Sequence, residues 1–196
     1  MQNIEVIFKE IFSEVEPIME QMDQAQMEAA VRAICSAKRI FAAGMGRSGY
    51  MMRCFGMRLM QMGLTTFMIG DTSTPSAQEG DLLIIGSGSG ETASLKGYVK
   101  KAKQLKCKVL VLTGHPESTL GREADVTVVL PVQEELHKNA DGSMIVYDTK
   151  NHGTKMLLGS RIELCMLLCT EALCMMVFQE MGFDESDMMR RHACFE

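Results

Sequence analysis

Two short glycine-rich segments hold the residues of this sequence that are best suited to chemistry. Residues 44–49 read GMGRSG and form the first glycine loop; residues 86–92 read GSGSGET and form the second glycine loop. Glycines let the main chain approach an anion closely, and hydroxyls and the N–H groups of a following helix can donate hydrogen bonds to it. The two loops predict a phosphate site, with the following candidate ligands: Gly46, Ser48, Ser87, Gly88, Ser89, Gly90, Glu91 and Thr92.

The first glycine loop alone leaves two kinds of ligand open. Its pattern Gly-x-Gly-x-x-Gly is also that of dinucleotide-binding folds, and Asp71 stands where an acid would hold a ribose. The second glycine loop favours a sugar phosphate, because a dinucleotide fold does not require a second loop of this kind. The alternative for the second loop is a plain Ser/Gly turn in which Glu91 or Thr92 starts a helix.

Five short apolar runs are expected to be the strands that carry these loops. Most of them are rich in Val, Ile or Leu without polar alternation, which is typical of parallel strands covered on both faces. The runs are residues 39–43, 65–69, 81–85, 108–113 and 126–130. Helical patterns separate several of them, so we predict an α/β fold: a doubly wound, five-stranded parallel sheet flanked by helices. Each glycine loop then follows a strand and opens a helix, at the edge where open α/β sheets bind ligands.

The remaining segments are expected to complete one domain, residues 1–196. Residues 4–35 predict N-terminal helices that Pro17 bends or divides. Residues 132–157 are polar and predict a long surface connection, of a kind that is often functional or mobile. A buried helix is expected from 161 to 181, and a short helix that ends near His192 follows it.

Composition narrows the class of protein further. The net charge is −5 and no long basic run occurs, so no nucleic-acid surface is expected. The seven cysteines include no Cys-x-x-Cys pair, which favours reduced thiols in a cytoplasmic protein over a zinc site. The most apolar stretch, 164–178, is short for a membrane span and carries Glu171, so we expect a buried helix and no membrane association.

Several motifs together resemble one known family. The two glycine loops, the helix segment 54–60, the segments 74–75 and 80–83, the segment 158–163 and the ending 184–192 are similar to 6-phospho-3-hexuloisomerases. These belong to the SIS (sugar isomerase) domain superfamily, and the resemblance spans most of the chain. It implies a single SIS domain and an enzyme that interconverts 3-hexulose 6-phosphate and fructose 6-phosphate. It also implies no metal or organic cofactor and, usually, a homotetramer.

Two departures from the family and a second likeness bear on the identity of the sugar. Segment 132–157 is longer than in the family, and the aromatic residue that precedes the family's catalytic glutamate is Ile162 here. Residues 115–120 resemble the related arabinose 5-phosphate isomerases. A non-catalytic phosphosugar sensor on the same fold is a further alternative, although such a protein would dispense with Glu163.

Moving a carbonyl group between neighbouring carbons requires a base that takes a carbon-bound proton and returns it next door. Glu163 is the candidate base; spacing alone favours a Ser-x-x-Glu capping box with Ser160, and the resemblance reverses that preference. His192 is a second candidate, which would open the sugar ring or move a proton between oxygens, in its own or a neighbouring subunit's site. Its alternative role is to complement a helix C-terminus. Arg47 would steady the enediolate oxygen or hold phosphate.

Overall fold

The computed structural model describes the chain from residue 2 to residue 192, except residues 133–136, 139–143, 146–153 and 158. Its centre is a five-stranded parallel sheet in the order β2-β1-β3-β4-β5. All five strands match the predicted runs to within one residue at each end, so the predicted α/β sheet is confirmed. They are β1 (Ile40–Gly44), β2 (Thr66–Met68), β3 (Leu82–Gly86), β4 (Lys108–Thr113) and β5 (Val126–Val129).

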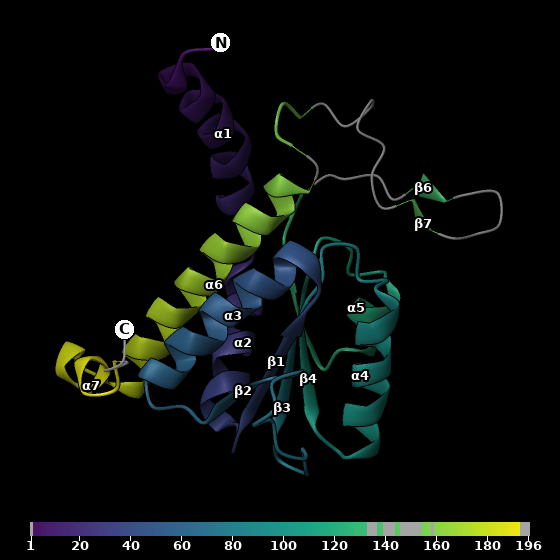
Figure 1. Ribbon diagram of the computed structural model, residues 1–196, viewed down its shortest axis with the longest axis vertical. Helices are drawn as coiled ribbons and strands as arrows, with labels where there is room; N and C mark the ends of the chain where they lie inside the picture. The colour runs from purple at the N-terminus through teal and green to yellow at the C-terminus, as the bar shows by residue number, and fades with distance from the viewer. Residues whose placement is uncertain (1, 133–136, 139–143, 146–153, 158, 193–196) are drawn as a thin grey trace.

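Helices cover both faces of the sheet, because neighbouring strand residues point to opposite sides. Ile40 and Ala42 of β1 belong to one core, whereas Phe41 and Ala43 belong to the other. The first core is closed by α2 (Gln24–Ser36), α3 (Gly46–Gln61) and α6 (Ser160–Met181), and the second by α4 (Ala93–Gln104) and α5 (Thr119–Glu123). Figure 1 shows α4 and α5 on one side of the strands and α3 and α6 on the other.

The predicted N-terminal helices are α1 (Ile4–Met19) and α2. The chain divides at residues 20–23, whereas Pro17 remains inside α1. Asp23 starts the second helix, since its carboxylate accepts the N–H of Gln26 at 3.1 Å. The first half of α1 extends beyond the sheet (Figure 1) and exposes an apolar stripe.

Only parts of the predicted connection 132–157 are described. They include the short antiparallel pair β6 (His137–Lys138) and β7 (Met144–Ile145). The end of the connection is fixed on α1, because the Lys155 N–H donates to Glu14 at 2.8 Å and its ammonium group lies 2.7 Å from Glu10. The connection also contains His152, a weaker sequence-based candidate for proton transfer, which lies outside the described residues.

Helix α6 is the predicted buried helix, and the short helix α7 (Glu185–Met189) follows it. By length and composition, α6 is apolar enough to cross a membrane, with a mean hydropathy of 1.7 in its most apolar window. Half of that window is buried inside the protein, and α6 packs on α1, α2 and α3. The core helix of a soluble protein passes the same test, so the length of α6 is weak support for a membrane span.

Candidate active site

Both glycine loops leave the sheet side by side at its topological switch point. Strands β1 and β3 are neighbours, and Gly44 at the end of β1 pairs with Gly86 at the end of β3. The chain continues from β1 into α3 on one face and from β3 into α4 on the other. Ligands of open α/β folds bind in the crevice formed at such a point. The fold therefore brings together the two segments that the sequence predicts to bind one phosphate.

The first glycine loop is held by close contact between its own glycines. A methyl group at Gly49 would lie 2.7 Å from the carbonyl oxygen of Gly44, so the start of α3 packs directly on the end of β1. Gly46 has a φ of 56°, in the left-handed region that favours glycine. Arg47 and Ser48 follow it in the first turn of α3, and the Arg47 side chain is 62% exposed.

The second glycine loop is held by hydroxyl groups. The buried Ser87 Oγ accepts the N–H of Gly90 at 3.2 Å and lies 3.2 Å from the Thr92 Oγ1. The Ser89 Oγ accepts the N–H of Glu91 at 3.2 Å. Within the described part of the chain, no acceptor is bound to the N–H groups of Gly88 and Ser89. Thr92 is the N-cap of α4 and makes no side-chain cap bond, so the first N–H groups of this helix also remain available to an anion.

Glu91 differs from the other predicted phosphate ligands because its carboxylate is already engaged. It accepts the N–H of Thr119 at 2.7 Å and lies 3.0 Å from the Lys96 ammonium group. Desolvation raises the pKa of Glu91, but the hydrogen bonds from Thr119 and Lys96 outweigh it and leave the pKa below its ordinary value. Sequence reasoning missed Thr119, although the likeness of residues 115–120 to other sugar isomerases was a signal for this segment.

Helix α6 brings its first turn to the same crevice. Glu163 is buried and forms an ion pair with Arg47 of the first glycine loop. A methyl group on Gly88 of the second glycine loop would lie 3.2 Å from the Ile162 side chain. A carboxylate and a guanidinium group therefore stand where the two loops meet.

The alternative role of Glu163 in a capping box is wrong. The N-cap of α6 is Gly159 in the left-handed conformation, and a glycine has no side chain that could cap the helix. Ser160 is the first helical residue, and its N–H donates to the carbonyl of Leu157 at 2.9 Å. The helix therefore begins one residue earlier than a capping box requires, and the Glu163 carboxylate turns to Arg47 instead.

His192 lies at the opposite end of the molecule. Glu163 is in the first turn of α6, and His192 follows α7, beyond the last turn. At 1.5 Å per residue, α6 alone separates the two by about 25–30 Å. The neighbouring Arg191 packs on Gly63, after the last turn of α3, whereas Arg47 begins that helix. Within one chain, the predicted pair Glu163 and His192 is not brought together.

The acid that a dinucleotide would use for its ribose is occupied. The Asp71 carboxylate accepts two hydrogen bonds from Arg53, at 2.9 and 3.4 Å, and this pairing raises the pKa of the arginine. Arg53 lines a cavity of about 240 Å³ on the β2 side of the first glycine loop. The pairing gives the dinucleotide alternative no free carboxylate at this position.

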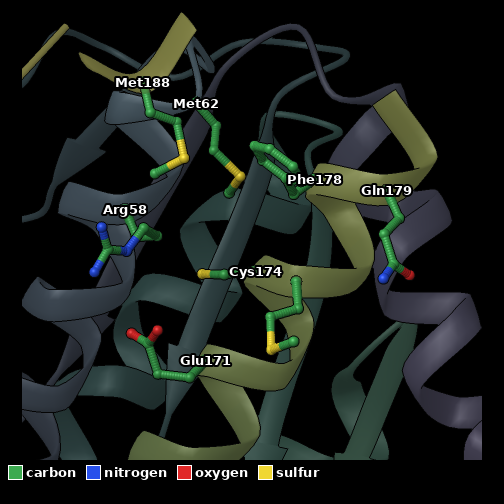
Figure 2. Close-up of a pocket in the computed structure, with 8 residues that line it drawn as sticks. Arg58, Met62, Glu171, Cys174, Phe178, Gln179 and Met188 are labelled. Carbon is green, nitrogen blue, oxygen red and sulfur yellow. The ribbon is translucent and has the colours of Figure 1, made fainter. Parts of the chain in front are cut away.

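A second cavity, of about 270 Å³, lies far from the glycine loops between α3, α6 and α7. Figure 2 shows Met62, Cys174 and Phe178 in its interior, with Arg58 and Glu171 on one side. No cluster of three or more potential metal ligands is present among the described residues.

The comparisons with known proteins agree with this geometry. The sequence matches the SIS domain family over residues 33–149, more than half of its length, and the chain belongs to that family. The 3-hexulose-6-phosphate isomerase of Bacillus subtilis (strain 168) is 36% identical to it over 187 residues, which cover 95% of this chain and 96% of that protein. The enzyme of the same name from Mycobacterium gastri is 32% identical, over 93% of this chain and 86% of its own.

A solved structure is similar over nearly the whole chain. It is a Methanococcus jannaschii protein whose structure led to an inferred function of 3-hexulose-6-phosphate isomerase. It aligns with a TM-score of 0.76 at 28% identity and covers 96% of this chain and 98% of its own. The predicted membership of the SIS superfamily and the predicted fold class are thereby confirmed.

Proposed function

We propose that this protein is a phosphosugar isomerase that interconverts 3-hexulose 6-phosphate and fructose 6-phosphate. The observation that carries the proposal is the Arg47–Glu163 pair, which stands between two loops of anion donors. The two named isomerases that align with this chain over more than nine tenths of its length support the same activity.

In the proposed complex the second glycine loop holds the phosphate. The hydroxyls of Ser87, Ser89 and Thr92, the N–H groups of Gly88 and Ser89 and the start of α4 supply the donors. Gly46 and Ser48 of the first glycine loop would approach the same ligand across the crevice. This arrangement leaves the sugar carbons to extend toward α6.

Glu163 is then the proposed base. Its carboxylate takes the proton from C2 of the 3-ketose, and the electron pair of that C–H bond forms the C2–C3 double bond of an enediolate. The negative charge rests on O3. The same carboxyl group returns its proton to C3 while the proton on O2 moves to O3, which leaves the carbonyl group at C2. A positioned base of this kind contributes about 10²–10⁴ in rate.

Arg47 is proposed to stabilise the enediolate. One of its N–H groups donates to Glu163, and a guanidinium group carries five N–H donors in all and stays charged. The remaining donors can face the developing oxyanion beside the base. The ion pair also orients the Glu163 carboxylate before the substrate arrives.

The direct test is to incubate the purified protein with 3-hexulose 6-phosphate and measure fructose 6-phosphate. We expect multiple turnovers with no added metal ion, coenzyme or reductant. Absence of turnover at high enzyme concentration would overturn the substrate assignment.

Arabinose 5-phosphate is the substrate of the alternative proposal, because residues 115–120 resemble isomerases of that sugar and contact the second glycine loop. Exclusive turnover of arabinose 5-phosphate would establish that alternative, whereas phosphosugar binding without any turnover would establish a sensor.

The proposal includes a homo-oligomer, and a tetramer in particular. Exposed apolar side chains gather on α1, where Ile4, Phe8 and Phe12 are each at least half exposed. Met175 of α6 is also exposed and lines the cavity shown in Figure 2, and Met57 on α3 and Met189 on α7 are exposed as well. Apolar patches of this kind are typical of protein–protein contacts. Light scattering coupled to gel filtration would measure the mass, and a monomer at micromolar concentration would contradict this part of the proposal.

In a homo-oligomer, His192 can lie next to the active site of another subunit. Since His192 lies at the far end of α6 from Glu163 of its own chain, we propose that it serves the site of a neighbouring subunit. Mixing two inactive variants, Glu163→Gln and His192→Ala, would then restore activity, because some mixed sites hold both native residues. If the mixture stays inactive although subunits exchange, His192 has no role across the interface.

A cytoplasmic location completes the proposal. The described cysteines form no disulfide with one another, which supports a reducing compartment. Burial raises the pKa of Cys169 and Cys174 to about 12, so these two are packing residues and poor nucleophiles.

A further inference from the structure

We infer that Glu91 is a positioning residue of the phosphate site, which fixes the second glycine loop on the start of α5 and does not itself bind phosphate. The inference rests on the proposed function of the loop, and it differs from the sequence-based prediction that Glu91 is a phosphate ligand. It also gives a role to the segment between β4 and α5, which the proposed mechanism does not use.

The contacts of the Glu91 carboxylate carry the inference. One oxygen accepts the main-chain N–H of Thr119 at 2.7 Å, and the Thr119 hydroxyl lies 3.0 and 2.9 Å from the two oxygens. The Lys96 ammonium group lies 3.0 Å from the second oxygen. These donors come from α4 and from the first turn of α5, on the sheet face opposite to α6. The carboxylate is thus held away from Glu163 and Arg47.

Charge gives a reason for this arrangement. A phosphate ester is an anion, and a free carboxylate in the loop that binds it would repel it. Lys96 balances the negative charge of Glu91, and Thr119 in the first turn of α5 donates further hydrogen bonds to the carboxylate. The carboxylate can therefore fasten the loop with charge-assisted bonds, which are stronger than neutral ones, while its charge is neutralised locally.

The main chain of the second glycine loop also bonds to the segment between β4 and α5. The carbonyl of Gly88 accepts the N–H of Gly114 at 3.0 Å, and the carbonyl of Gly90 accepts the N–H of Leu120 at 3.1 Å. A methyl group at Gly90 would lie 1.9 Å from the Ser118 Oγ, so the loop sits directly on this segment. With its carbonyls turned toward the β4–α5 segment, the loop can present N–H groups to a ligand. The Glu91 carboxylate adds charge-assisted hydrogen bonds to these two main-chain bonds. The N–H of Glu91 also donates to the Ser89 Oγ and orients that hydroxyl.

The variant Glu91→Gln distinguishes a positioning role from simple repulsion of the ligand, because the two predict opposite changes in phosphate affinity. We expect about tenfold weaker binding of both inorganic phosphate and fructose 6-phosphate, measured by calorimetry, because charged hydrogen bonds that orient the donors are lost. Maximal turnover should stay within about twofold, since Glu163 is untouched, so KM rises while kcat does not fall. If Glu91 merely repelled the ligand, the variant would bind phosphate more tightly, and tighter or unchanged binding would overturn the inference.

The matched control is Glu79→Gln, which removes the same charge from an exposed carboxylate that pairs with Lys106 at 3.5 Å. Its phosphate affinity should equal that of the wild type. Should Glu91→Gln fail to fold, Thr119 provides the test, because Thr119→Ser keeps the hydroxyl donor and Thr119→Val removes it. We expect wild-type affinity from the serine variant and weaker phosphate binding from the valine variant. Equal affinity of these two variants would overturn the inference.

The outcomes separate this inference from the proposed function. A wild-type protein that binds phosphate but does not turn over 3-hexulose 6-phosphate contradicts the proposed reaction and leaves the role of Glu91 measurable. A fully active wild type whose Glu91→Gln variant binds phosphate equally well contradicts the inference and leaves the reaction intact.

Discussion

The two glycine loops leave neighbouring strands at one edge of the sheet, yet the protein fixes them by different means. In the first glycine loop, close main-chain contact between Gly44 and Gly49 sets the shape, and Arg47 projects from it with 62% of its side chain exposed. In the second glycine loop, Ser87 is 3% exposed and side-chain bonds hold the chain. A loop held by its main chain leaves its side chains available for chemistry. A loop held by its side chains leaves its N–H groups available for binding.

We expect the largest effect, a loss of turnover, from a substitution at Glu163. It tests whether the loops bind the substrate while α6 supplies the chemistry. Glu163→Gln should lower kcat by about 10²–10⁴, because the proposed base is lost. Binding of fructose 6-phosphate should change little, since both loops keep their donors. Steady-state kinetics and calorimetry measure the two quantities, and Glu180→Gln, an exposed carboxylate on the same helix, is the control. Normal turnover by Glu163→Gln would remove the catalytic role.

The packing of the first glycine loop is tested by Gly49→Ala. The added methyl group would meet the Gly44 carbonyl oxygen at 2.7 Å, so the free energy of unfolding should fall by about 1–3 kcal/mol. Gly97→Ala, within α4 where a methyl group meets no atom within 4 Å, should instead raise it by about 0.5–1 kcal/mol. Urea unfolding of both variants measures the difference. Equal stabilities would show that the first loop is not held by its glycines.

Removing one hydroxyl from each loop compares their parts in binding. Ser87→Ala should weaken phosphate binding by about tenfold, because the buried hydroxyl is the proposed donor to the ligand and also accepts the N–H of Gly90. Ser48→Ala should have a smaller effect, since Ser48 is only partly buried and no such bond to another described residue depends on it. Phosphate titrations of the two variants would give the ratio. A larger loss in Ser48→Ala would reverse the comparison.

The smallest expected effect concerns pH. The folded pKa of Glu91 lies below its ordinary value of 4.5. Its contribution to stability is therefore fully present above that value and is lost as the pH falls through the lower, folded pKa. The stability difference between the wild type and Glu91→Gln should be constant from neutral pH to about 4.5 and should shrink in more acidic solution. Urea unfolding across that range measures it, and a difference that grew with acid would contradict the assigned bonds.

Much of the fold was predictable because its signals are local. The five strands are continuous apolar runs, and all of them were placed to within one residue. The two glycine loops were recognisable because each follows a predicted strand and opens a helix, where open α/β sheets bind ligands. The break between α1 and α2 was misplaced, because a proline near the last turn resembles a helix end, whereas Asp23 supplies the actual start of α2.

The roles of several site residues were not predictable, because they depend on partners far away in the sequence. The choice between a cap and a base for Glu163 depends on where α6 begins, which Gly159 decides, and on Arg47, 116 positions earlier. The sequence predicts Glu91 as a phosphate ligand because its neighbours in the loop are suited to binding one. Its partner Thr119 is 28 positions away and comes into reach only when β3 pairs with β4.

The two glycine loops and the sheet that carries them can be identified from the sequence alone, since each depends on residues within a few positions of one another. How the loops are held, and which side chains face the crevice between them, follows only from the three-dimensional fold. This is because strand order, and not distance along the chain, sets which charges and hydroxyls can meet. As a result, Arg47 of the first loop pairs with Glu163 of α6, and Glu91 of the second loop bonds to Thr119 of α5. His192 lies at the far end of the molecule.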